Sequence, residues 1–318
     1  MLLAGSCYGL ISPLIRFEYT LGFTAADLTN AQYGIAFLIS WAIVLIRRKR
    51  SVVHAKQLLL LICLGASAAL VSISYYMALT VLPASFATIL LFQFAWMATF
   101  IDIVVTRKLP SVLKWLGLVV ILAGTFLAVG FGAGGAREAG TNAVGVSHYS
   151  LWAIGLGLLA AFFYTLTLYL SGYISESVSP ELRSAIVVTV GMLIVFIPFR
   201  PTYLVSGVLW HGLIFWGGLI AIVGQVAPML LMLAAIPRIG GRMAAILGTI
   251  ELPVSVLGAW LLNHDIVSIV RWFGVLLILI GIGVSESEEV LREWWNRQKR
   301  SRSKNNHDSK KASPITRP

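Results

Sequence analysis

The stretch RMAAILGTIELPVSVLGAWLL, from Arg242 to Leu262, sets one carboxylate, Glu251, among apolar residues. A related stretch occurs earlier in the chain, SFATILLFQFAWMATFIDIVV from Ser85 to Val105, with Gln93 in the place of Glu251. Each is followed by a short polar turn and by a further apolar run. The sequence therefore predicts two copies of one unit of apolar helices.

Paired glycines support this duplication. Gly117 and Gly124 follow the first stretch, and Gly274 and Gly281 follow the second, with corresponding glycines 157 residues apart. Gln93 and Glu251 are 158 residues apart, so we expect one small insertion between the copies. Glycines two helical turns apart permit close helix contact, either between the repeats or in a homodimer.

The composition indicates an all-α membrane protein. Hydrophobic residues make up 58% of the 318 residues and charged residues 12%, with a mean hydropathy of +0.87. Soluble domains carry about 25% charged residues, and a membrane-spanning helix needs about 20 apolar residues. We predict ten transmembrane helices: Leu2–Phe17, Leu28–Ile46, Gln57–Leu79, Ala84–Val105, Leu113–Phe131, Ser150–Tyr173, Ser179–Pro198, His211–Ile236, Gly241–Leu262 and Val267–Ser285. The first is shorter than its counterpart at Ser150, which leaves open whether Met1 is the true start of the protein.

The basic residues predict the orientation of these helices. Of the 24 Lys and Arg residues, all but four fall on one side or in the C-terminal tail; the exceptions are Arg16, Arg137, Arg200 and Arg271. Basic loops stay in the cytoplasm, so we expect both termini inside and the chain in the plasma membrane. Five helices per repeat is an odd number, which predicts two inverted five-helix repeats with a site near the midplane.

The expected organisation has four parts. Residues 1–131 form the first repeat, 132–149 an extracytoplasmic linker, 150–285 the second repeat, and 286–318 a basic cytoplasmic tail that is partly disordered. The tail holds nine basic and five acidic residues and so contributes +4 to the net charge of +11. Next to a membrane helix, such a tail indicates contact with anionic lipid of the bilayer and not with nucleic acid.

Ten spans, two inverted repeats, a polar residue in the fourth helix of each repeat and a paired-glycine fifth helix resemble the EamA-type members of the drug/metabolite transporter superfamily. The resemblance covers residues 1–285. It implies a ten-helix bundle around a central cavity and secondary transport of small metabolites such as amino acids, often outward. The sequence departs from the family pattern at Glu251-Leu252-Pro253 and at Gln93-Phe94-Ala95, which has no proline.

Glu251 is the main candidate for a functional residue. It lies about ten residues from either end of its predicted helix, and an ionisable group at that depth must face protein or water. Three roles are open: contact with a small-molecule substrate, proton coupling, or a structural hydrogen bond to another helix. Pro253 removes a backbone donor two residues later and favours a helix bend.

Other polar and aromatic residues in the predicted helices are candidates for lining the cavity, although at helical spacing such residues more often pack. They are Gln93, Gln225, Trp96, Tyr8, Tyr75, Tyr76 and Tyr164, with Pro228 as a second helix bend.

The sequence contains no nucleotide-binding GxxxxGK[ST] motif, and its five histidines lack the spacing of metal ligands. We therefore expect no cofactor and no metal. A proton-coupled drug exporter, a metabolite importer, and a membrane-embedded enzyme or sensor remain alternatives to a metabolite exporter.

Overall fold

The computed structural model of the chain describes residues 1–47, 53–107, 111–129, 150–171, 173, 178–200, 207, 209–231, 247, 250–264, 268–270 and 272–284. Every regular element within these ranges is a helix. The predicted all-helical class is therefore confirmed. The predicted linker (132–149) and tail (286–318) lie outside the described residues.

Six helices form the first part of the chain: α1 (Leu2–Thr20), α2 (Ala25–Arg47), α3 (Ala55–Leu79), α4 (Ala84–Leu91), α5 (Phe94–Thr106) and α6 (Val112–Val129). The second part contains α7 (Leu151–Ser171), α8 (Pro180–Val195), α9 (Ile214–Ala221) between the π-helical turns η3 (Leu209–Leu213) and η4 (Ile222–Val226), α12 (Glu251–Asn263) and the apolar helix Trp272–Val284.

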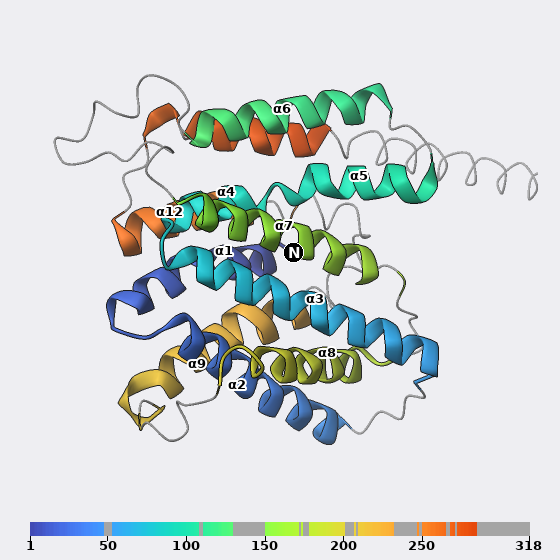
Figure 1. Cartoon of the computed structure of the whole chain (residues 1–318), viewed down its shortest axis with the longest axis vertical. Coiled ribbons are helices and arrows are strands. Elements are labelled where there is room, and N and C mark those ends of the chain that lie inside the picture. The colour runs from blue at the N-terminus through green and yellow to red at the C-terminus, as the bar shows by residue number, and fades with distance from the viewer. Residues whose placement is uncertain are drawn as a thin grey trace, which may run out of the picture.

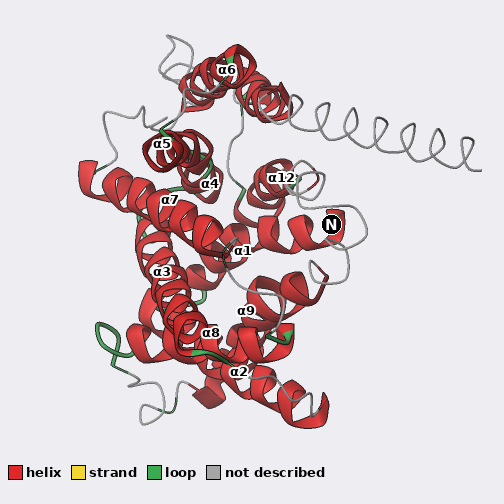
Figure 2. Ribbon diagram, turned by 90° about the vertical axis from the view of Figure 1, so that its right-hand side faces the viewer, coloured by secondary structure: helices red, strands yellow, loops and turns green. Residues whose placement is uncertain are grey.

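The helices run side by side across the molecule (Figure 1). Helices α2, α8 and α9 lie at one edge of the bundle, α1, α3 and α7 lie in its middle, and α6 lies at the opposite edge (Figures 1 and 2). Helices α1 and α12 pack together, as do α3 and α7, so helices from both parts of the chain interleave.

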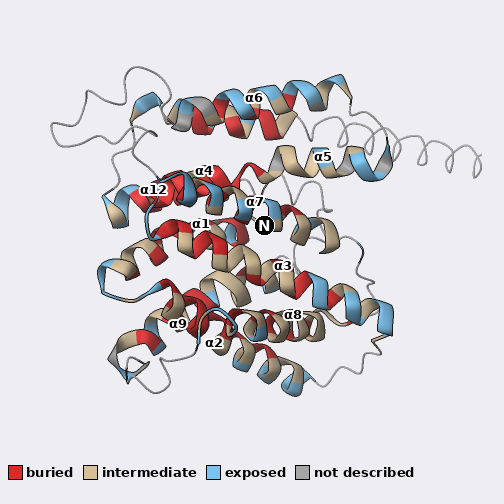
Figure 3. Ribbon diagram, viewed as in Figure 1, coloured by how far each residue is buried: buried red, intermediate tan, exposed pale blue. Residues whose placement is uncertain are grey.

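Five of the described helical segments are long and apolar enough to cross a membrane: Ala25–Arg47, Ala55–Leu79, Ala84–Val105, Leu151–Ser171 and Ile214–Leu231. Large apolar side chains are also exposed, including Ile46 (79% exposed), Trp152 (70%) and Phe273 (58%). Exposed residues recur along several helices of the bundle (Figure 3). An apolar exterior of this extent is typical of a surface that faces another apolar phase. Both observations are compatible with a membrane protein.

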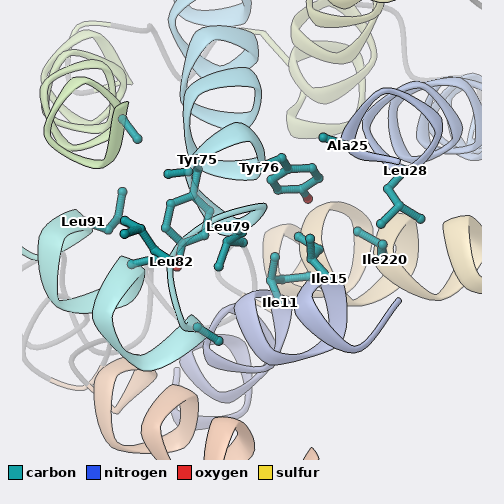
Figure 4. Close-up of a cluster of buried hydrophobic side chains, with 14 of the residues drawn as sticks. Ile11, Ile15, Ala25, Leu28, Tyr75, Tyr76, Leu79, Leu82, Leu91 and Ile220 are labelled. Atoms are coloured by element: carbon teal, nitrogen blue, oxygen red, sulfur yellow. The ribbon is translucent and has the colours of Figure 1, made fainter. Parts of the chain in front are cut away.

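The bundle interior is close-packed. Its largest cluster of buried apolar residues joins α1, α2, α3, α4, α7 and α9 around Tyr75, Tyr76, Leu79 and Leu82 (Figure 4). Both the internal and the external faces of these helices are apolar, so the sequence pattern alone does not tell them apart. The structure shows which faces are internal.

The predicted helix Ala84–Val105 is interrupted at Phe92 and Gln93, where α4 ends and α5 begins. The Gln93 backbone N–H donates to the Leu90 carbonyl (3.1 Å), and the Gln93 side-chain amide donates to the Ile89 carbonyl (3.1 Å). The side chain therefore replaces the backbone donor of a regular helix, which permits the break.

Glu251 does not lie within a continuous α-helix, as the sequence predicted. It is the first residue of α12, and Ile250 before it lies in a turn. Pro253 occupies the third position of this helix, where its missing N–H breaks no helical hydrogen bond. The proline therefore lies in the first turn of α12, and the helix bend predicted at Pro253 stays a prediction.

Helices α5 and α12 have corresponding bounds. Each contains 13 residues, and each ends at a residue with left-handed backbone, Arg107 (φ 52°) after α5 and His264 (φ 54°) after α12. The first residues of the two helices, Phe94 and Glu251, are 157 residues apart, and so are their last residues, Thr106 and Asn263. This spacing pairs Glu251 with Phe94. The expected pairing with Gln93, and the small insertion that it required, do not fit these bounds.

The paired glycines lie at one contact between α6 and the helix Trp272–Val284. A Cβ added to Gly124 would lie 2.8 Å from the Gly274 carbonyl oxygen, and one added to Gly281 would lie 2.8 Å from the Gly117 carbonyl oxygen. The glycines thus serve a reciprocal contact within the chain, so close packing in a homodimer is not needed to explain them.

Candidate functional site

Glu251 lies where α12 packs against α1. A Cβ added to Gly9 of α1 would lie 2.5 Å from the Glu251 carbonyl oxygen, and a Cβ added to Gly258 of α12 would lie 2.7 Å from Cγ of Pro13. Only residues without a side chain allow the two backbones to approach so closely. The start of α12 is thereby fixed against the middle of α1.

The Glu251 carboxylate interacts electrostatically with three tyrosines: Tyr8 of α1, Tyr75 of α3 and Tyr164 of α7. Tyr75 is buried, whereas Glu251, Tyr8 and Tyr164 are half-buried. These four sequence-predicted residues are therefore brought together from four helices. We call them the Glu251 site.

The Glu251 carboxylate makes no hydrogen bond or ion pair with any side chain in the described part of the chain, so the structural hydrogen bond considered from the sequence is not formed there. Its position at the start of α12 places it beside backbone N–H groups that carry the positive end of the helix dipole. The carboxylate is consequently available to a ligand or a proton.

A buried cluster of hydroxyl groups adjoins this site. Thr88 Oγ1 lies 2.8 Å from Ser12 Oγ, 2.6 Å from Ser255 Oγ and 2.9 Å from the Tyr75 hydroxyl, and the two serine oxygens are 2.8 Å apart. The cluster joins α1, α3, α4 and α12. It also holds the Tyr75 hydroxyl, which interacts with Glu251, in a fixed position.

The sequence analysis did not identify Ser12, Thr88 or Ser255. Helical spacing could have identified two of them. Ser12 follows Tyr8 by four residues and Ser255 follows Glu251 by four residues, so each lies on the same helix face as a candidate. No comparable spacing relates Thr88 to another candidate.

Gln93 and Trp96 form a separate group. Gln93 is buried and donates to Thr125 Oγ1 of α6 (2.9 Å), and the Trp96 indole N–H donates to the Gln93 side-chain oxygen (3.2 Å). The bond to Thr125 joins Gln93, between α4 and α5, to α6. Phe94 connects this group to the Glu251 site, since its ring makes an edge contact with Tyr164 at a centroid distance of 5.0 Å.

Tyr76 and Gln225 form a third group, joined by a residue that the sequence analysis missed, Gln32 of α2. The Tyr76 hydroxyl donates to the Gln32 side-chain oxygen (2.5 Å), and the Gln32 amide donates to the Gln225 side-chain oxygen (3.3 Å). Gln225 lies in the π-helical turn η4, three residues before Pro228. A proline removes a helical donor, and the helix bend predicted at Pro228 stays a prediction.

A small, shallow pocket opens between α2, α8 and the segment after η4, lined by residues that include Ser40, Glu181 and Met229. At its edge the Arg47 guanidinium donates to the Glu181 carboxylate (2.9 Å). The pocket contains none of the sequence-predicted site residues. Within the described residues, no group of three His, Cys, Asp or Glu side chains could hold a metal ion.

No protein-family model matches the sequence, and no curated protein matches it. The fold is similar to that of a solved structure described as "Crystal structure of protein", with a TM-score of 0.52 and 14% sequence identity over 88% of this chain and 97% of that chain. At this identity the similarity concerns the fold alone. The arrangement of helices described above is thus shared with a structure determined by experiment.

Proposed function

We propose that the chain is a secondary transporter of small metabolites, amino acids or related compounds, that works as an exporter by alternating access. In this proposal ten membrane spans form two inverted five-helix repeats, both termini are cytoplasmic, and the Glu251 site binds the substrate. The resemblance to the EamA-type transporters suggests the substrate class and the direction.

Two observations support the internal repeat. Helices α5 and α12 correspond in length and in their left-handed ends at a separation of 157 residues. The glycine contact between α6 and Trp272–Val284 is reciprocal: Gly124 packs against the Gly274 carbonyl oxygen, and Gly281 packs against the Gly117 carbonyl oxygen. The corresponding glycines are again 157 residues apart. A two-fold relation between repeats produces contacts of this kind.

The Glu251 site is the observation that carries the proposal. Its residues come from both proposed repeats, Tyr8 and Tyr75 from the first and Tyr164 and Glu251 from the second. Rocking of one repeat against the other would change the surroundings of the carboxylate. A half-buried carboxylate beside a helix break and three phenols can also bind a polar group of a small solute.

Counterflow in proteoliposomes tests this proposal. Vesicles are loaded with a mixed panel of amino acids, nucleosides and organic cations, and uptake of each labelled compound is measured for the wild type and for Glu251→Gln. We expect saturable exchange of one class by the wild type and at least a tenfold loss in Glu251→Gln if the carboxylate binds the solute. Asp27→Asn is the matched control, because Asp27 is bonded only to Thr24 of its own turn.

Retention of exchange by Glu251→Gln, with loss of pH-gradient-driven accumulation, would assign a proton-coupling role to Glu251. That outcome fits the proton-coupled drug exporter if the exchanged compounds are organic cations. Accumulation inward with a physiological gradient would favour an importer. An absence of exchange by a folded and correctly oriented wild type would contradict transport and favour a membrane-embedded enzyme or sensor.

A further inference from the structure

A second carboxyl group, Glu18, lies near the end of α1, at the end of the bundle where the turn Leu21–Thr24 joins α1 to α2. Its side chain has no solvent exposure, and neither carboxyl oxygen has a hydrogen-bond partner among the described residues. Burial of an ionised carboxylate without a donor is costly. Such a group is stable in this environment only as the neutral acid.

Nearby donors are committed to other acceptors. The Arg16 guanidinium donates to the carbonyls of Leu79 (2.8 Å) and Thr80 (3.0 Å) at the end of α3, and the Tyr19 hydroxyl donates to the Tyr76 carbonyl (2.8 Å). Arg16 also precedes Glu18 by two residues, so the two side chains leave α1 on opposite sides. Within the described part of the chain, Glu18 therefore forms no ion pair.

The other titratable groups that interact electrostatically with Glu18 are the phenols of Tyr19 and Tyr76. Of the helices that pack on α1, α4, α9 and η4 contain no titratable side chain, and α12 contributes only Glu251. Helix α3 contributes Tyr75 beside Tyr76, with Cys63 and Lys56 farther along it. The hydroxyl of Tyr76 itself donates to Gln32, so it does not bind Glu18.

We propose that Glu18 is a proton-binding site of this chain, distinct from the Glu251 site, and that it binds a proton in the closed state and releases it when this end of the bundle opens. On binding, a proton from water joins one carboxylate oxygen to give the neutral acid; on release, the proton returns to water. The role of this proton in driving transport rests on the function proposed above.

The structure gives Glu18 a short path to water. Thr20, Leu21 and Gly22 directly after it are exposed, and the Glu18 carbonyl accepts hydrogen bonds from the backbone N–H groups of Leu21 (3.1 Å) and Phe23 (3.4 Å). In our proposal, displacement of this exposed turn gives water access to the carboxyl group. Tyr76, which interacts electrostatically with Glu18, is bonded through Gln32 to Gln225 and so links α3, α2 and η4.

Infrared spectroscopy of the full chain in proteoliposomes tests the protonation directly. The wild type at neutral pH should show a carbonyl band of a protonated carboxyl group that is absent in Glu18→Gln and retained in Asp27→Asn, the control at the same end of the bundle. Glu18→Asp should shift the band. A wild-type band that neither Glu18→Gln nor Glu18→Asp alters would overturn the proposal, and Glu18→Asp keeps the test valid if Glu18→Gln does not fold.

The coupling is tested with whichever solute of the panel the wild type exchanges. We expect Glu18→Gln to retain counterflow and to lose accumulation driven by a pH gradient, with accumulation falling to the level reached without a gradient. Undiminished gradient-driven accumulation in Glu18→Gln would refute a coupling role for this proton. A wild type that exchanges no solute would instead refute the proposed function, while the infrared band would still report on Glu18.

Discussion

The reciprocal glycine contact predicts that Gly281→Ala destabilises the chain. The added Cβ would lie 2.7 Å from Cγ1 of Ile121 and 2.8 Å from both the Gly117 carbonyl oxygen and the Ile121 backbone nitrogen. Two of these three atoms belong to the backbone of α6 and cannot turn away. The helices would have to separate by about 0.6 Å to restore ordinary contact.

The size of the effect follows from two opposing contributions. Overpacking of a close contact costs about 1–3 kcal/mol, and replacement of glycine by alanine inside a helix contributes up to about 1 kcal/mol of stability. Gly283→Ala isolates the second contribution, because Gly283 lies in the same helix and a Cβ there would meet no atom within 4 Å. We therefore expect Gly281→Ala to be less stable than Gly283→Ala by about 1–3 kcal/mol.

The free energy of unfolding of each variant can be measured in mixed micelles by titration with a denaturing detergent. Gly124→Ala should resemble Gly281→Ala, and the double variant should cost less than the two single costs together, because one separation of the helices relieves both contacts. Equal stability of Gly281→Ala and Gly283→Ala would refute this account of the contact.

Two further predictions concern polar contacts, each measured by the same unfolding titration. Thr88→Val should lower the free energy of unfolding by about 1–3 kcal/mol, since it removes the common partner of three buried hydroxyl groups. The control Thr80→Val should have little effect, because the hydrogen bond it loses is exposed and lies within its own turn. Arg47→Gln should cost about 1 kcal/mol, because Arg47 is 55% exposed while its partner Glu181 is buried, and Glu181→Gln should cost less in the Arg47→Gln background than alone. An equal cost in both backgrounds would show that the pair is not coupled.

The sequence predicted the helical class correctly because apolar runs bounded by polar turns require helices in an apolar phase. It did not predict the break between α4 and α5. No proline or glycine marks that position, and the break depends on a side-chain bond from Gln93 to the Ile89 carbonyl, which a pattern of apolar residues cannot reveal. Ten membrane spans remain a prediction, whereas the structure describes five helical segments of sufficient length and apolarity.

The candidate site was predicted only in part, for a related reason. Depth in an apolar helix selected Glu251, Tyr8, Tyr75 and Tyr164, and the three tyrosines interact electrostatically with Glu251, while their role as a functional site stays a prediction. The same criterion also selected Gln93 and Gln225, which bond to other side chains on neighbouring helices. Depth identifies a polar group that needs a partner but does not identify the partner, and that distinction requires the packing of the helices.

The two helix breaks have different causes, and this difference bears on how the halves move. At the start of α12, Pro253 lacks the donor of a continuous helix, so a continuous helix here would leave one carbonyl without its helical donor. Between α4 and α5, by contrast, the backbone donors are present, and the Gln93 side chain takes the Ile89 carbonyl in place of its own backbone N–H. A continuous helix there needs only the exchange of that side-chain bond for the backbone bond, whereas one at α12 loses a hydrogen bond. If the halves rock, the break that carries the carboxylate is therefore the costlier one to straighten, and the break near Gln93 is the one that straightens more readily.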